Sequence, residues 1–105
     1  MGAGLLESAY EACLAYELVK SGLEVRRQIQ VPVQYDHLQL DVGYRVDMFV
    51  NDRVIVELKA VEKLLPIHTA QLLTYLKLSK LRLGFLLNFN VEHMKHGVKR
   101  VVNGY

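Results

Sequence analysis

A hairpin of two strand-forming segments constrains the fold of this chain more than any other feature of its sequence. Residues 45–50 read RVDMFV and residues 54–59 read VIVELK, with a short polar turn of Asn, Asp and Arg between them. Two β-rich runs joined in this way predict a β-hairpin. Because successive side chains of a strand alternate between its faces, Glu57 and Lys59 share one face, and the hairpin can bring Asp47 onto it.

Two carboxylates and one ammonium group therefore converge in an otherwise apolar sheet. Burying such charges is costly unless a cation or a strong pairing network compensates for them. Carboxylate oxygens are natural ligands of Mg²⁺ or Mn²⁺, and a neighbouring lysine can orient a water molecule or stabilise developing charge. The alternative is a structural ion pair at the sheet margin, in which Lys59 bridges Asp47 or Glu57. The hairpin by itself leaves both interpretations open.

Composition places the chain among ordinary globular domains. Its 105 residues are enough for one hydrophobic core, so we expect a single domain spanning residues 1–105. A hydrophobic fraction of 51% and a charged fraction of 23% argue against disorder. The formal net charge of +2 permits a nucleic-acid partner but does not argue for one.

The single cysteine, Cys13, excludes an intrachain disulfide and a cysteine-rich zinc site. It lies in an apolar helical segment, which favours a buried structural thiol over a nucleophile. No apolar segment reaches the roughly 18 residues needed to span a bilayer, and we find no signal-peptide pattern. We therefore expect a cytoplasmic protein without a membrane partner.

The periodicity of the sequence predicts an α/β fold, a mixed sheet carrying two helices in the order α-β-β-β-α-β. Pro32 places the first strand at a sheet edge or a bulge, and the apolar run after the hairpin turn favours a central strand. The first helix is apolar on more than one side, so we expect the sheet and a second surface to cover it. Residues 98–102 fit either a short strand or a helical turn. Helices are expected at residues 5–20 and 66–78, and strands at residues 24–36, 38–50, 54–60 and 83–89.

Polar side chains on the two predicted helices are candidates to join the hairpin cluster. Glu7 shares a helical stripe with Gly4 and Tyr10, where it either faces the site or is solvated beside the polar face of Glu11. On the second helix, Gln71 and Tyr75 lie four residues apart, with His68 on the same stripe. They either contact a substrate or a metal-bound water, or they serve the packing of the protein itself.

Histidines and basic residues elsewhere carry weaker signals. His93 and His96 have a spacing that can pair two imidazoles, but a solvated tail is favoured because no third ligand is near in the sequence. Small basic clusters are expected on solvated faces, although together they could follow a phosphate backbone. These clusters are Arg26 and Arg27; Lys77, Lys80 and Arg82; and Lys95, Lys99 and Arg100.

The order of elements and the placement of these residues resemble the core of the PD-(D/E)xK nuclease superfamily. Asp47 lies on the second strand, Glu57-x-Lys59 on the third, and Gln71-x-x-x-Tyr75 on the next helix, an element that looks like the RecB-type branch. More closely, GLLESAY at residues 4–10 matches the signature of the GxxExxY protein family. Further blocks similar to that family lie at residues 54–60, 70–76 and 87–90, so the resemblance covers nearly the whole chain.

The resemblance implies a restriction-endonuclease-like core and a phosphodiesterase site that depends on Mg²⁺ or Mn²⁺. Asp47 and Glu57 would be metal ligands, with the backbone carbonyl of Leu58 nearby. An anionic phosphodiester resists nucleophiles until a cation neutralises it, which explains the need for such a donor set. The family usually carries a helical segment before the glycine, so a start at Met1 could expose the first helix or leave a gap that a partner fills.

The resemblance also implies roles for the remaining candidates. Lys59 would position or activate the attacking water, and Glu7 would complete the acidic set from the first helix. Gln71 and Tyr75 would orient the site or hold DNA.

Three functional interpretations remain open from the sequence. The leading one is a metal-dependent nuclease acting on DNA, with RNA as a further possible substrate. The second is a catalytically inactive nuclease fold that binds nucleic acid or a protein partner through its basic clusters. The third is a small interaction protein whose exposed helix pairs in a homodimer.

Overall fold

Seven elements make up the computed structural model, which describes residues 3–90 and 95–104 of the chain. The predicted order α-β-β-β-α-β is confirmed, and a further strand follows it, so residues 98–102 belong to a strand rather than a helical turn. The elements are α1 (Ala3–Lys20), β1 (Val25–Tyr35), β2 (Leu38–Val50), β3 (Val54–Lys59), α2 (Pro66–Ser79), β4 (Leu83–Asn90) and β5 (Lys95–Val102).

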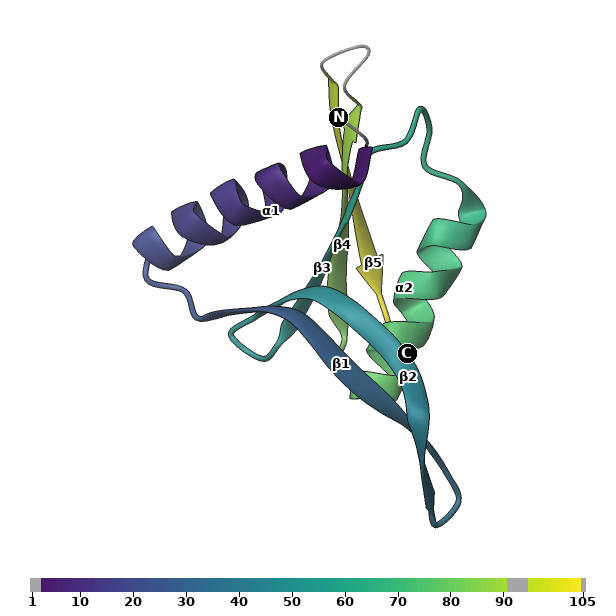
Figure 1. Ribbon diagram of the computed structural model, residues 1–105. Coiled ribbons are helices and arrows are strands. Elements are labelled where there is room, and N and C mark those ends of the chain that lie inside the picture. The colour runs from purple at the N-terminus through teal and green to yellow at the C-terminus, as the bar shows by residue number, and fades with distance from the viewer. Residues whose placement is uncertain (1–2, 91–94, 105) are drawn as a thin grey trace.

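The strands form one mixed sheet in the order β1-β2-β3-β4-β5, with the two helices on opposite sides (Figure 1). β3 and β4 run parallel, whereas the other neighbouring pairs run antiparallel. A parallel pair needs a crossover connection, and α2 provides it. The mixed α/β architecture agrees with the sequence prediction, and β3 lies at the centre of the sheet, as its apolar sequence indicates.

β1 lies at the edge of the sheet and also carries an irregularity. Its register against β2 shifts between Pro32 and Val33, so the proline lies both on an edge strand and beside a bulge. Gly43 is the register partner of Pro32. A Cβ at Gly43 would collide with the backbone carbonyl oxygen of Val31, so only glycine permits this close approach of the two strands.

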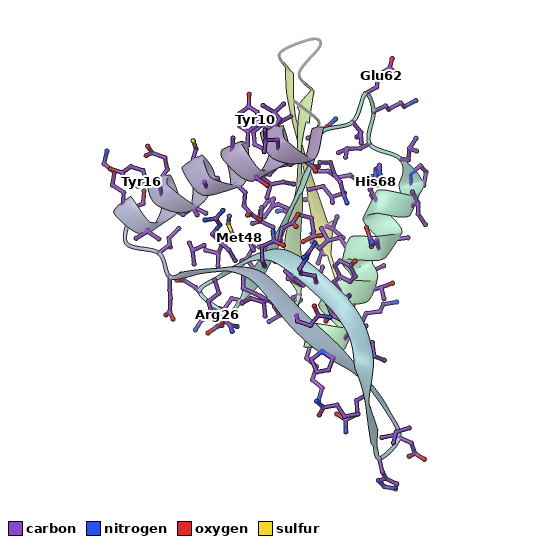
Figure 2. All side chains as sticks on the ribbon, viewed as in Figure 1. Tyr10, Tyr16, Arg26, Met48, Glu62 and His68 are labelled. Atoms are coloured by element: carbon purple, nitrogen blue, oxygen red, sulfur yellow. The ribbon has the colours of Figure 1, made fainter. Side chains whose placement is uncertain are left out.

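Each face of the sheet has its own apolar cluster beneath one helix. On the α2 face, the fully buried Leu72 and Leu76 pack with Ile55 of β3. On the α1 face, Ala15 packs in a cluster with the fully buried Met48 (Figure 2). β3 is therefore buried from both sides, which accounts for its nearly continuous apolar sequence.

The outer face of α1 is exposed, in contrast to the expectation that a second surface covers it. Leu5, Tyr16 and Val19 on this helix are 57%, 65% and 56% exposed. Cys13 is exposed as well, so the prediction of a buried thiol is wrong. The reason is that α1 packs on the sheet with one side only. Within the described chain, neither helix is long and apolar enough to cross a bilayer.

Candidate active site

β2 separates from β3 at a fork that is closed by carboxylate side chains. The backbone ladder pairs residues 48–50 with residues 54–56. Next to it, the N–H of Asp47 donates to Oε2 of Glu57 at 2.7 Å, and the N–H of Leu58 donates to Oδ2 of Asp47 at 2.9 Å. Carboxylate oxygens thus replace the carbonyl acceptors of a regular ladder. We call Asp47 and Glu57 the fork carboxylates.

The alternation of side chains between the two faces of β2 is also interrupted at Asp47. Residues two apart in a regular strand share a face, yet Val46 packs in the α2-side cluster and Met48 in the α1-side cluster. On the neighbouring strand, Gln28 has a φ of 52°, in the left-handed region that strand residues avoid. The alternation rule predicted that Asp47 can reach the face of Glu57, but not that the strands would be distorted around it.

Glu57 lies in an environment that disfavours its charge. The residue is only 5% exposed. Burial, followed by the charge of Asp47, raises the pKa of Glu57 to about 8, and the charge of Glu11 acts in the same direction. The N–H of Asp47 and the ammonium group of Lys59 oppose this rise without cancelling it. A carboxyl group in this position is stabilised by either a proton or a cation.

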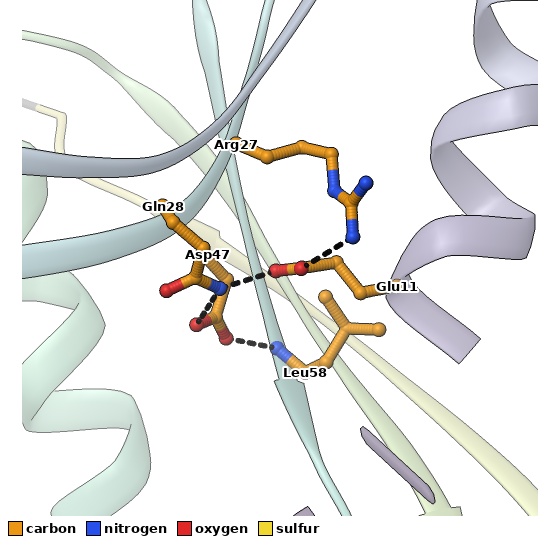
Figure 3. Close-up of polar contacts among 5 residues, drawn as sticks. All are labelled: Glu11, Arg27, Gln28, Asp47 and Leu58. Atoms are coloured by element: carbon orange, nitrogen blue, oxygen red, sulfur yellow. Dashed lines mark hydrogen bonds and ion pairs between the residues drawn. The ribbon is translucent and has the colours of Figure 1, made fainter. Parts of the chain in front are cut away.

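A further acidic group approaches the fork from α1. Glu11, which is buried, accepts hydrogen bonds from the Arg27 guanidinium at 2.9 Å and from Nε2 of Gln28 at 2.6 Å. The same Nε2 lies 3.4 Å from Oδ1 of Asp47, so one amide links the helix to the fork (Figure 3). Sequence reasoning chose Glu7 for this role and missed Glu11. The signal that could have found it is the helical stripe, since residues four apart face the same side.

The predicted site residues all line one cleft of about 880 Å³ between α1, the first three strands and α2. The structure brings them together from four different elements, α1, β2, β3 and α2. They are Glu7, Asp47, Glu57, Leu58, Lys59, Gln71 and Tyr75. Lining residues that sequence reasoning did not assign to the site are Ser8, Glu11, Arg27, Gln28, Gly43, Tyr44 and Arg45.

The α2 wall of the cleft carries a stacked pair of tyrosines. The rings of Tyr75 and Tyr44 lie with their centroids 4.3 Å apart and their planes within 10° of each other. The Tyr44 hydroxyl lies 2.7 Å from Oγ of Ser79, which anchors the stack to the end of α2. Burial, followed by the charges of the fork carboxylates, raises the pKa of Tyr75, while a hydrogen bond with Gln71 opposes the rise. The Tyr75 hydroxyl is therefore protonated at neutral pH and can donate into the cleft.

Other candidates serve the fold or lie away from the cleft. Nδ1 of His68 accepts a hydrogen bond from the N–H of Leu65 at 2.9 Å, so this imidazole stabilises the start of α2 instead of joining the cleft lining. Arg26 forms an ion pair with Asp52 in the hairpin turn. His93 and the side chain of His96 lie outside the described residues, so their predicted pairing is not tested.

The donor chemistry of the fork fits a hard divalent cation. Asp47 and Glu57 present carboxylate oxygens, and the backbone carbonyl of Leu58 follows directly in the chain. Among the described residues, no group of three or more Asp, Glu, His and Cys side chains is arranged to hold a metal ion. Mg²⁺ is commonly bound by one or two carboxylates and completes its octahedron with waters and substrate phosphates. Two carboxylates in a polar cleft are therefore sufficient for such an ion.

Comparison with known proteins agrees with this geometry. A family model described as the PD-(D/E)XK nuclease superfamily matches residues 1–101. A search of curated proteins gives no match. The family match covers α1, the whole hairpin and α2, and so includes each element that lines the cleft.

Solved structures with the same fold are longer than this chain. The crystal structure of SSO0001 matches with a TM-score of 0.71 and 17% identity, covering 100% of this chain and 54% of that one. An alkaline exonuclease, LHK-Exo from Laribacter hongkongensis, matches with a TM-score of 0.67 and 16% identity, covering 99% of this chain and 60% of that one. At such identities the likeness is one of fold, and this chain spans little more than half the length of either protein.

Proposed function

Because this chain belongs to the PD-(D/E)XK nuclease superfamily, we propose that it is a metal-dependent nuclease that hydrolyses phosphodiester bonds in DNA. The observation that carries the proposal is the fork, where Asp47 and Glu57 are held side by side in a polar cleft. The GLLESAY signature at residues 4–10 supports a finer assignment to the GxxExxY branch of the superfamily. The fold of LHK-Exo, whose name describes an exonuclease, is consistent with this chemistry.

In this proposal Asp47, Glu57 and the carbonyl oxygen of Leu58 hold Mg²⁺ or Mn²⁺. When bound, the ion would offset the negative charge of the phosphodiester and lower the pKa of a water molecule, which makes that water a better nucleophile. The raised pKa of Glu57 supports this assignment, because a buried carboxyl that is costly to ionise gains most from a cation beside it. The residues of the chain contribute the ligands and a fixed geometry.

Lys59 follows Glu57 by two residues on β3 and lines the same cleft. Its ammonium group is near enough to the carboxyl of Glu57 to lower that carboxyl's pKa. We assign Lys59 the task of positioning the attacking water and stabilising negative charge that develops on the phosphate. Its charge is compact and strongly hydrated, which suits a role beside a water molecule.

The helices supply the remaining polar groups. Glu7 adds negative charge from α1, and Gln71 and Tyr75 face the fork from α2. Because Tyr75 keeps its proton at neutral pH, its hydroxyl can donate to a phosphate oxygen or to a water. Gln71, which hydrogen bonds with Tyr75, would orient that hydroxyl. These groups hold and orient the substrate while the fork carries the chemistry.

A nucleic-acid substrate is favoured because cationic side chains line the cleft beside the acidic fork. Arg27, Arg45 and Lys59 are part of the lining, and Arg45 is exposed. Phosphate contacts of this kind supply most of the sequence-independent affinity for nucleic acid. These side chains offer phosphate contacts within the cleft.

A cleavage assay on single-stranded, duplex and branched DNA, with Mg²⁺ or Mn²⁺, tests the proposal. Asp47→Asn and Lys59→Ala are expected to abolish cleavage, whereas Asp36→Asn, which removes a carboxylate from the β1–β2 turn outside the cleft lining, leaves it unchanged. RNA substrates in the same assay decide the preferred nucleic acid. A purified chain that cuts none of these substrates with either metal would contradict the proposal.

A second candidate function is a nuclease fold that binds nucleic acid without cutting it. The observation that favours it is that Arg27, Arg45 and Lys59 line the cleft, where they can contact a phosphate backbone with or without a bound metal ion. It predicts salt-sensitive DNA binding that survives Asp47→Asn and is never accompanied by cleavage. The same set of substrates distinguishes the two functions when both binding and the formation of cleavage products are measured.

A further inference from the structure

Gln28 is the one residue within β1 that has a left-handed backbone conformation, with a φ of 52°. Its neighbours pair regularly with β2, Arg27 with Met48 and Ile29 with Val46, so the distortion is confined to a single position. A non-glycine residue in this region costs free energy, and glycine would adopt it more easily. Strain of this kind persists where the rest of the structure imposes it, and it often marks a functional position.

The side chain of Gln28 makes a contact that glycine could not. Its Nε2 donates to Oε1 of Glu11 at 2.6 Å and lies 3.4 Å from Oδ1 of Asp47 (Figure 3). An amide nitrogen carries two hydrogens, one for each carboxylate. The orientation of the amide follows from its neighbours, because its carbonyl oxygen would be repelled by two carboxylate oxygens.

The other hydrogen bonds of Glu11 and Asp47 show which carboxylate oxygens the Gln28 amide contacts. Oε2 of Glu11 is taken by Arg27, and Oδ2 of Asp47 is taken by the N–H of Leu58. Gln28 thus reaches the second oxygen of each carboxylate and fixes its orientation. Since the amide is neutral, it links the two anions without adding a positive charge that would compete with a bound cation.

We infer that Gln28 is a positioning residue, whose amide holds the carboxylates of Glu11 and Asp47 in the arrangement that admits a divalent cation at the fork. This inference rests on the proposed metal-dependent function. Partners that orient metal ligands through hydrogen bonds commonly change metal affinity or activity by ten- to a hundredfold when they are replaced. The backbone strain at Gln28 is the cost of aiming its amide between the two carboxylates.

Two variants, Gln28→Leu and Gln28→Gly, test this role by calorimetric titration with Mn²⁺ and by thermal unfolding without metal. Both are expected to bind Mn²⁺ about ten- to a hundredfold more weakly than the wild type. Both variants lose the hydrogen bonds of the amide, but only Gln28→Gly relieves the backbone strain, so its melting temperature is expected to be higher than that of Gln28→Leu. Gln34→Leu and Gln34→Gly are the matched controls, since Gln34 is an exposed glutamine at a regular position of the same strand. Neither control should change Mn²⁺ affinity, and Gln34→Gly should lower the melting temperature.

The outcomes separate this inference from the function on which it rests. If the wild type and both Gln28 variants bind Mn²⁺ equally, the positioning role is wrong while the metal site stands. If Gln28→Leu alone loses affinity while Gln28→Gly binds Mn²⁺ like the wild type, the backbone strain and not the amide matters, and the positioning role is also wrong. If neither the wild type nor Asp47→Asn binds Mn²⁺, the proposed metal site is wrong, and the inference about Gln28 is wrong as well.

Discussion

The backbone N–H of Asp47 donates a hydrogen bond of 2.7 Å to Oε2 of Glu57, and this bond joins the two acidic residues where β2 leaves β3. It keeps two carboxyl groups close together in a part of the protein where Glu57 is almost fully buried. Both groups cannot be charged at low cost without a cation nearby. This arrangement leads to predictions about stability and metal binding, and the surrounding cleft and core lead to predictions about DNA binding and packing.

The metal-free protein is expected to lose stability as the pH rises from about 4.5 to about 8. Over this window the folded state keeps a proton on Glu57 that the unfolded chain releases, because the folded pKa is about 8 and the ordinary value is 4.5. The free energy of unfolding therefore falls with pH by an amount on the order of a few kcal/mol, and levels off above the folded pKa. Urea denaturation at a series of pH values in EDTA measures this slope.

Glu57→Gln keeps the shape of the side chain and removes its titration. The slope between pH 4.5 and 8 should largely disappear in this variant, whereas Glu17→Gln on the exposed side of α1 should retain it. An unchanged slope in Glu57→Gln would mean that another group binds the proton.

The affinity for Mn²⁺ is expected to rise as the pH increases towards 8. In the proposed site a cation would displace the proton from Glu57, so metal binding would release a proton wherever that group is protonated in the free protein. The apparent affinity should increase by up to about tenfold per pH unit between pH 6 and pH 8. Calorimetry in two buffers of different ionisation enthalpy counts the released proton directly. A constant affinity across this range would argue against Glu57 as a ligand.

Arg45 is expected to contribute one phosphate contact. Arg45→Gln should weaken DNA binding at low salt and reduce the slope of log affinity against log salt concentration by about one. Arg53→Gln, in the hairpin turn outside the cleft lining, is the matched control and should leave the slope unchanged. Fluorescence anisotropy at several salt concentrations in EDTA provides the measurement, and equal slopes for the two variants would place the DNA elsewhere.

The packing of α2 on β4 depends on a size match between Leu72 and Gly84. A Cβ at Gly84 would lie 3.0 Å from Cδ1 of Leu72, which is fully buried. Gly84→Ala alone should destabilise the protein by about 1–3 kcal/mol, and Leu72→Ala alone by about 2–5 kcal/mol. The double variant should lose less than the sum of the two, because the added methyl group fills part of the space left by Leu72. Urea denaturation of the four proteins gives the coupling, and strict additivity would show that the two sites do not share this space.

Local sequence signals were sufficient for most of the fold. The alternation in β1, the apolar run of β3 and Pro66 at the start of α2 each predicted an element that the structure confirms. These signals are short-range, because strand and helix periodicity depends on residues within a few positions of one another. The outer face of α1 is where such reasoning failed, since an apolar helix pattern does not say what covers each side.

The sequence by itself predicted which residues gather at the candidate site: Asp47, Glu57 and Lys59 on a hairpin, and Gln71 and Tyr75 four apart on a helix, all of which line the same cleft. Only the tertiary structure decided that Glu11 rather than Glu7 is the buried carboxylate of α1, and that Gln28 connects it to Asp47. Spacing along one element fixes which side chains share a face, but the choice between neighbouring turns of a helix depends on how that helix lies across the sheet. The distortion of β1 at Gln28 likewise arises from contacts between segments far apart in the chain.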